Sequence, residues 1–227
     1  MKLHFDDFVY GSIDGAVTTF AIVAGVVGAS LSPAIILILG FGNLFADGFS
    51  MAAANYQASK ARNQFIEMKR KQEEWEIDNL AEQEKDEIRE IYKKKGFKDE
   101  LLEEIVRIIT SRRKVWVDTM MKEELGLIED EKGPLNSAIS TFIGFNLIGI
   151  IPLIPFMIFI FMGTHANSEA FVYSTISVMA SFFLVGMIKG KIVRKSKIRS
   201  GFYTLIIGGI AALVAYFVGY GLNFLVQ

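Results

Sequence analysis

A carboxylate stands near the start of the first long apolar stretch of the chain. Asp14 is followed by an apolar run that reaches Ala29. An ionisable side chain at membrane depth is energetically costly and marks an ion or proton site. Burial favours the protonated carboxyl group, whereas a nearby metal ion favours the ionised form. Asp14 therefore predicts a site where a cation and a proton compete, the alternative being an interfacial carboxylate that reaches water.

A second polar series lies in the next apolar stretch. Four side chains recur every four residues and so share one helical face: Asn43, Asp47, Met51 and Asn55. As separate residues they have ordinary explanations, because Met fills gaps in cores and Asn joins membrane helices. A carboxylate, an amide and a thioether together suit a transition ion better than Ca²⁺ or Mg²⁺, which take oxygen ligands.

A third set of candidate ligands lies in the charged middle of the chain. Four glutamates fall on one stripe if a single helix carries them: Glu73, Glu76, Glu84 and Glu87. A later segment ends in Met120, Met121 and Glu124. Taken alone, such glutamates indicate a solvated face with lysine partners, and methionines beside Trp116 are typical of a core.

The distribution of charge indicates the elements that position these residues. Most charged side chains lie between Arg62 and Lys132, and only Glu169 lies between Pro134 and Ile188. We predict five apolar spans, each long enough to cross a membrane and therefore helical: 8–29, 33–58, 135–162, 168–188 and 201–226. The fold class is thus an all-α integral membrane protein with a helical insert between the second and third spans. The expected domains are 1–59, 60–133 and 134–227.

Local signals refine these elements. Pro152 and Pro155 predict a kink or break in the third span, and Gly11 and Gly15 form a pair that permits close helix contact. The second span is expected to continue as one helix to Lys95, because 59–95 contains neither Gly nor Pro and Gly96 follows. Apolar spacing predicts a second insert helix over 99–125.

Basic residues predict the orientation. Six of them fall within 189–199, whereas the turns at 30–32 and 163–167 carry none. The positive-inside rule places this loop in the cytoplasm, and with it the N-terminus and the insert, so the C-terminus lies outside. The short chain, without an N-terminal extension, leads us to expect a prokaryotic plasma membrane, or a vacuolar membrane if the source is eukaryotic.

The composition excludes several kinds of site. The chain has no cysteine, which excludes disulfides, thiolate zinc sites and iron–sulfur clusters. Its only histidines are His4 and His165. A metal must therefore be held by carboxylate, amide, carbonyl and thioether groups. We predict no catalytic residue, no organic cofactor and no nucleic-acid partner.

Several blocks, in order and spacing, resemble the vacuolar iron transporter family over essentially the whole chain. The most specific are Ile13-Asp14-Gly15, Ser50-Met51-Ala52, Trp116-Val117-Asp118, Met120-Met121-Lys122 and Ile151-Pro152-Leu153-Ile154-Pro155-Phe156. The resemblance implies a homodimer of five-helix protomers that exchanges cytosolic Fe²⁺ for protons along a path lined by the first two helices. It assigns intramembrane metal ligation to Asp14 and Met51. It assigns cytoplasmic metal ligation to Glu73, Glu76, Glu84, Glu87, Met120, Met121 and Glu124.

One position departs from the family pattern. Asn43 stands where relatives commonly have a glutamate, and Asp47 stands where they usually have a small residue. Our hypothesis is that Asp47 replaces the missing carboxylate, one turn nearer Met51. The change leaves Mn²⁺, Co²⁺ and Zn²⁺ as further candidate substrates beside Fe²⁺.

Three other functions are compatible with the same residues. A passive divalent-cation channel needs no proton flux, and a membrane metal sensor binds ions without moving them. A membrane-anchored di-iron ferroxidase uses paired Glu-x-x-His motifs, and the insert contains no histidine. We therefore expect a transporter rather than an enzyme.

Overall fold

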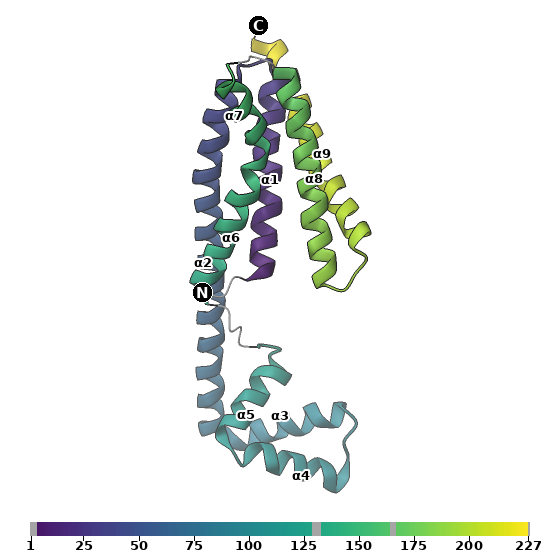
Figure 1. Ribbon diagram of the computed structural model, residues 1–227. Helices are drawn as coiled ribbons and strands as arrows, with labels where there is room; N and C mark the ends of the chain where they lie inside the picture. The colour runs from purple at the N-terminus through teal and green to yellow at the C-terminus, as the bar shows by residue number, and fades with distance from the viewer. Residues whose placement is uncertain (1–3, 129–132, 164–166, 227) are drawn as a thin grey trace. The chain divides into compact units, whose positions relative to one another are not determined.

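The computed structural model describes residues 4–128, 133–163 and 167–226, and these residues form helices and no strands (Figure 1). His165 lies outside them. Five helices are long and apolar enough to cross a membrane: Phe5–Gly28, Pro33–Asn79, Pro134–Phe161, Glu169–Ile192 and Lys197–Leu222. The predicted fold class is confirmed.

The chain divides into two compact units, Met1–Gln57 with Lys132–Gln227, and Ala58–Glu131. We call the first the membrane unit and the second the insert; its cytoplasmic position remains a prediction.

The membrane unit is built around its first helix. Its elements are α1 (Phe5–Gly28), the first part of α2 (Pro33–Asn79), α6 (Pro134–Gly149), η2 (Ile151–Leu153), α7 (Ile154–Phe161), α8 (Asn167–Ile192) and α9 (Lys197–Val226). Helix α1 contacts α6, α8 and α9 and lies in the middle of this unit in Figure 1. Val23 of α1 and Phe145 of α6 are fully buried in the same apolar cluster. Because α1 begins at Phe5, Asp14 lies nine residues, or about 13 Å, along the helix, deeper than the sequence indicated.

The predicted close contact at Gly11 and Gly15 is confirmed, and it joins α1 to α6. A Cβ atom on Gly11 would lie 2.2 Å from the backbone oxygen of Thr141, and one on Gly15 would lie 2.3 Å from that of Phe145. Gly144 of α6 approaches α1 in the same way, 2.2 Å from the backbone oxygen of Phe8. Small residues thus let the two backbones touch, as in other membrane helix pairs.

We expect Gly15→Ala to destabilise the membrane unit, because the added methyl group meets backbone that cannot move aside. Overpacking of this kind costs about 1–3 kcal/mol, which lowers the midpoint of thermal unfolding in detergent by several degrees. Gly42→Ala is the matched control, since nothing lies within 4 Å of the Cβ position at Gly42 on α2. Equal midpoints for the two variants would contradict this reading of the α1–α6 contact.

The third span is broken at the predicted prolines. Helix α6 ends at Gly149, a 3₁₀ turn covers Ile151–Leu153, and α7 begins at Ile154. The backbone oxygen of Pro152 accepts a hydrogen bond from the Ser174 hydroxyl of α8 at 2.7 Å. A neighbouring helix therefore satisfies a backbone group that the break frees, as apolar surroundings require.

The insert combines the last part of α2 with α3 (Ala81–Lys94), α4 (Asp99–Thr110), α5 (Arg113–Thr119) and η1, a π-helix over Met120–Glu124. Helix α2 ends at Asn79, and Leu80 leaves helical geometry with φ −127° and ψ 34°. The prediction of one helix to Lys95 is therefore wrong. The single helix over 99–125 is also wrong, because α4 ends at Thr110 and α5 begins at Arg113.

Packing explains the breaks inside the insert. Ile66 and Ile77 of α2 share one buried cluster with Ile88 of α3, and Leu102 and Trp116 join it from α4 and α5. A straight helix through Leu80 would carry Ile88 away from Ile66. Burial of these side chains outweighs the helix propensity of the residues around Leu80. Gly96 follows the end of α3 in the left-handed conformation, with φ +100°, and so terminates this helix as the sequence predicted.

Candidate metal sites

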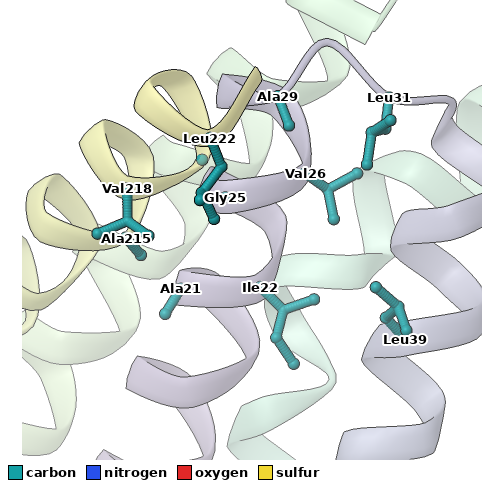
Figure 2. A pocket seen from close by; sticks show the side chains of 11 residues that line it. Ala21, Ile22, Gly25, Val26, Ala29, Leu31, Leu39, Ala215, Val218 and Leu222 are labelled. Carbon is teal, nitrogen blue, oxygen red and sulfur yellow. The ribbon is translucent and has the colours of Figure 1, made fainter. Parts of the chain in front are cut away.

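The cavity in Figure 2 contains no metal ligand. It measures about 480 Å³ and lies between α1 and α9, with Leu31 and Leu39 on its remaining side. Its lining consists of Ala, Val, Ile, Leu and Gly residues, including Ile22, Val26 and Leu222. A divalent ion there would find no charged or polar side chain, so the candidate ligands elsewhere in the chain are the relevant ones.

Polar side chains of α1 meet polar side chains of α2 in an antiparallel series. Asn43 donates a hydrogen bond from Nδ2 to the Thr18 hydroxyl at 3.3 Å. Near the other end, Asn55 donates from Nδ2 to Oδ1 of Asp7 at 3.0 Å. We call this series the α1–α2 seam and define it by Asp7, Asp14, Thr18, Asn43, Asp47 and Asn55.

The two acidic residues in the middle of the seam lie at the same level, because Asp14 is one turn before Thr18 and Asp47 is one turn after Asn43. Both side chains are partly buried. The Thr18 hydroxyl donates to the backbone oxygen of Asp14 at 2.9 Å. The structure thus brings together Asp14, Thr18, Asn43 and Asp47 from α1 and α2.

Met51 lies one helical turn from both Asp47 and Asn55 on α2. Its side chain is partly buried and packs against the apolar core of the membrane unit. This is the packing role that the sequence left open beside metal ligation. The sulfur remains a proposed ligand on the strength of its position along the seam.

Asp7 belongs to the seam, and sequence reasoning passed over it. Asn55 contacts Asp7 and also donates to the Thr141 hydroxyl of α6 at 2.7 Å, so one amide ties three helices together. The second carboxylate oxygen of Asp7 is buried and has no hydrogen-bond partner among the described residues. The signal was available, because Asp7 lies two turns before Asp14 and therefore on the same face of α1.

The insert gathers five carboxylates. Glu73 of α2 interacts electrostatically with Glu124, Glu76 and Glu87, and Glu84 interacts with the same groups. We call these five residues the carboxylate cluster. The predicted single stripe is wrong, because Glu73 and Glu76 lie on α2 whereas Glu84 and Glu87 lie on α3. The break at Leu80 folds the two pairs toward each other, and Glu124 joins them from η1.

Two members of the cluster are buried without hydrogen bonds to one of their oxygens. Glu73 and Glu84 are each 3% exposed, and Oε2 of each has no partner within the described residues. Burial raises the pKa of Glu84 to about 7, and repulsion from Glu87 and Glu73 adds to the rise. Burial and the charge of Glu87 also raise the pKa of Glu124. The negative charge of the cluster is therefore not fully compensated by nearby cationic side chains.

The cluster is not a finished coordination sphere. Among residues 4–128, 133–163 and 167–226, no three His, Cys, Asp or Glu side chains are placed as ligands of one metal ion. The cluster gathers negative charge and carboxylate oxygen atoms, and ligation of a metal ion by them stays a prediction.

The two methionines of the insert form part of its core. Met120 and Met121 are 0% and 2% exposed and belong to the cluster of buried apolar side chains around Trp116 and Val117. They start the π-helix that also carries Glu124, closed by a bond from the Leu125 N–H to the Met120 oxygen at 3.2 Å. The π-helix is a feature often found at functional sites, so ligation by these thioethers stays a prediction.

We expect metal binding by the insert to be weaker by about tenfold or more at pH 5.5 than at pH 7.5. Metal ligation needs ionised carboxylates, and the pKa of Glu84 near 7 leaves this group protonated at the lower pH. Isothermal titration with Mn²⁺, carried out on Asp14→Asn protein to silence the seam, measures the affinity. The pKa of Glu73 is raised to about 7 by burial as well, so Glu73→Gln combined with Glu84→Gln should flatten the pH dependence. An affinity that does not change between the two pH values would refute the prediction.

The same pKa rise fixes the sign of the effect on stability without metal. Between the ordinary glutamate pKa of 4.5 and about 7, the folded insert holds a proton on Glu84 that the unfolded chain releases. The contribution of Glu84 to stability is therefore most favourable below this window and falls as the pH rises through it. A bound dication would reverse the loss by compensating the ionised cluster.

The helices and the acidic residues at membrane depth define the class: a multi-pass α-helical membrane protein with a carboxylate-rich insert. Residues 5–220 match the model of the VIT family, and the chain belongs to that family. It is 36% identical over 223 residues to a protein of Plasmodium falciparum named vacuolar iron transporter, a match that covers 96% of this chain and 82% of that protein.

Two further relatives carry similar names. A Toxoplasma gondii protein named vacuolar iron transporter is 39% identical over 217 residues, which are 93% of this chain and 72% of the relative. Vacuolar iron transporter 1 of Arabidopsis thaliana is 33% identical over 211 residues, which are 92% and 82% of the two chains. These relatives are eukaryotic and give no support to the expectation of a prokaryotic plasma membrane.

Proposed function

We propose that this protein carries Fe²⁺ out of the cytosol across a membrane in exchange for protons. Membership of the VIT family and the names of the relatives support iron transport. The acidic pair in the α1–α2 seam supports the exchange with protons. Mn²⁺, Co²⁺ and Zn²⁺ are included as possible substrates, because carboxylate, amide and thioether groups do not single out iron.

The position of Asp14 and Asp47 at one level of the seam is the observation that carries this proposal. Two carboxylates at one level between apolar membrane helices repel each other, and a cation or protons relieve that repulsion. A dication compensates both charges, and protons compensate them equally well when the ion leaves. The pair therefore has two compensated states, one with metal and one with protons. Alternation between them, driven by a pH difference across the membrane, gives exchange.

The carboxylate cluster of the insert serves capture. Five acidic side chains within range of each other create a negative potential that raises the local concentration of divalent ions. Thioethers of Met120 and Met121, beside Glu124 on η1, would favour transition ions over the more abundant Mg²⁺. The ion then passes to Asp14, Asp47 and Met51, with Asn43 and Asn55 as neutral neighbours in the seam.

The proposed direction of transport rests on the charge of the loops. By the positive-inside rule, the basic residues of 189–199 support a cytoplasmic position for the α8–α9 turn, the N-terminus and the insert, with the C-terminus on the far side. The proposed protein is a homodimer, as the resemblance to the vacuolar iron transporter family implies.

Flux through purified protein in liposomes tests the proposal. Fe²⁺ or Mn²⁺ should move in the direction opposite to an imposed proton gradient, and metal movement should change the internal pH. Metal flux that leaves the internal pH unchanged would show a passive channel instead. A bridged di-ferric product after aerobic addition of Fe²⁺ would show a ferroxidase, an outcome that the absence of histidine from 60–133 opposes.

A further inference from the structure

The turn between the last two helices contains a basic pocket. Its volume is about 560 Å³, within the range of small-ligand sites. Three cationic side chains line it, Lys189 from α8, Lys195 from the turn and Arg199 from α9. Four hydroxyl-bearing residues complete its polar part: Ser196, Ser200, Tyr203 and Thr204. We call this site the basic pocket; it takes no part in the metal sites described above.

The positive charge of this region has no local counterpart. No Asp or Glu occurs between Ala170 and Gln227. In the part of the chain that the structure describes, no ion pair is formed by any of the six basic residues of 189–199: Lys189, Lys191, Arg194, Lys195, Lys197 and Arg199. Three of the six line one cavity, so an anion entering it would meet several cations at once.

The pocket is a built feature of the hairpin. A Cβ atom on Gly186 would lie 2.7 Å from the backbone oxygen of Ser200, and one on Gly190 would lie 2.8 Å from Cβ of Ser200, so α8 and α9 nearly touch. The turn itself is fixed, since the Lys195 N–H bonds to the Gly190 oxygen at 2.9 Å. Arg194 occupies the left-handed position of this helix-ending motif, with φ 53°.

The walls of the pocket indicate the kind of ligand. Val193 and Ile207 supply apolar surface beside the cationic side chains, and Ile207 lies within the apolar span of α9. A ligand that fits has an anionic group next to hydrocarbon and lies at the boundary of a membrane. Lysine and arginine side chains bind phosphate strongly, and basic pockets between membrane helices bind anionic headgroups.

We propose that the basic pocket binds the phosphate headgroup of an anionic membrane lipid. The lipid phosphate contacts Lys189, Lys195 and Arg199, and its acyl chains run along Val193 and Ile207. The bound lipid compensates the positive charge of the basic side chains that line the pocket. This inference stands apart from iron transport, and either of the two can fail without the other.

The loop offers a matched pair of variants. Lys189→Gln with Lys195→Gln and Arg199→Gln removes the three charges that line the pocket. Lys191→Gln with Arg194→Asn and Lys197→Gln removes three charges of the same loop that do not line it, and Asn suits the left-handed position.

Full-chain protein in neutral detergent is titrated with phosphatidylglycerol or phosphatidylcholine, and native mass spectrometry counts bound lipid. We expect the pocket variant to lose at least about ten times more affinity for phosphatidylglycerol than the control variant.

Each other outcome overturns the proposal. Equal losses in the two variants would show diffuse attraction to the loop. Equal binding of phosphatidylcholine by the unaltered protein would show that lipid charge is not read. Displacement of bound phosphatidylglycerol by millimolar inorganic phosphate would assign the pocket to a soluble anion. Thermal unfolding in the same detergent shows whether the variants fold. If the pocket variant does not fold, Arg199→Gln alone replaces it and is expected to weaken binding less than the triple change.

Discussion

Replacing Asp14 by Asn is expected to lower proton-driven Fe²⁺ flux in liposomes by on the order of a hundredfold. The amide keeps the size of the side chain but can neither compensate a dication nor exchange it for a proton. Loss of groups that merely support a metal ligand already costs tenfold to a hundredfold in affinity or activity, and Asp14 is proposed to touch the ion. The measurement is metal flux with and without a pH gradient, at equal amounts of inserted protein.

The control is Asp6→Asn. Asp6 is itself exposed in the first turn of the same helix and is not one of the residues that define the seam, so its replacement removes a carboxylate from α1 but none from the seam. Flux should be close to that of the unaltered protein. Mn²⁺ binding by the insert should also survive Asp14→Asn, which separates loss of transport from loss of folding. Full proton-driven flux in the Asp14→Asn protein would remove the central claim of the proposed mechanism.

Replacing Asp47 by Asn is expected to lower the flux by about tenfold or more and to flatten its dependence on the pH gradient. Asp47 lies at the level of Asp14 in the seam, so its removal leaves a site that a single proton compensates. Flux recorded at several values of the gradient gives both the rate and its pH dependence. If both stay as in the unaltered protein, the hypothesis that Asp47 supplies the second carboxylate is wrong.

A compensating change makes the test of Asp47 sharper. Asn43→Glu combined with Asp47→Ala moves the carboxylate back by one helical turn, to the position that the resemblance to the family assigns to a glutamate. Asn43 contacts Thr18, which follows Asp14 by one turn, so a glutamate there still meets α1 at the seam. We expect this double variant to recover most of the flux that Asp47→Ala alone loses. Failure to recover would show that the position of the carboxylate matters as well as its presence.

The sequence by itself determined the class of the protein and the position of its spans. Apolar length decides whether a segment can cross a membrane, and the lack of backbone partners in lipid makes each span helical. Pro152 marked the break in the third span, and Gly11 and Gly15 marked the close contact of α1 with α6. These are local signals, because each depends on the chemistry of one or two residues.

Only the tertiary structure decided how the candidate ligands come together. The break at Leu80 carries no Gly or Pro signal and depends on Ile66, Ile77 and Ile88 burying one another. That break folds Glu73 toward Glu84, whereas a continuous helix would have strung them along one stripe. The place of Asp7 in the seam likewise depends on Asn55 of a different helix. Contacts between segments far apart in the chain are set by packing, and packing leaves no fixed spacing in the sequence to read.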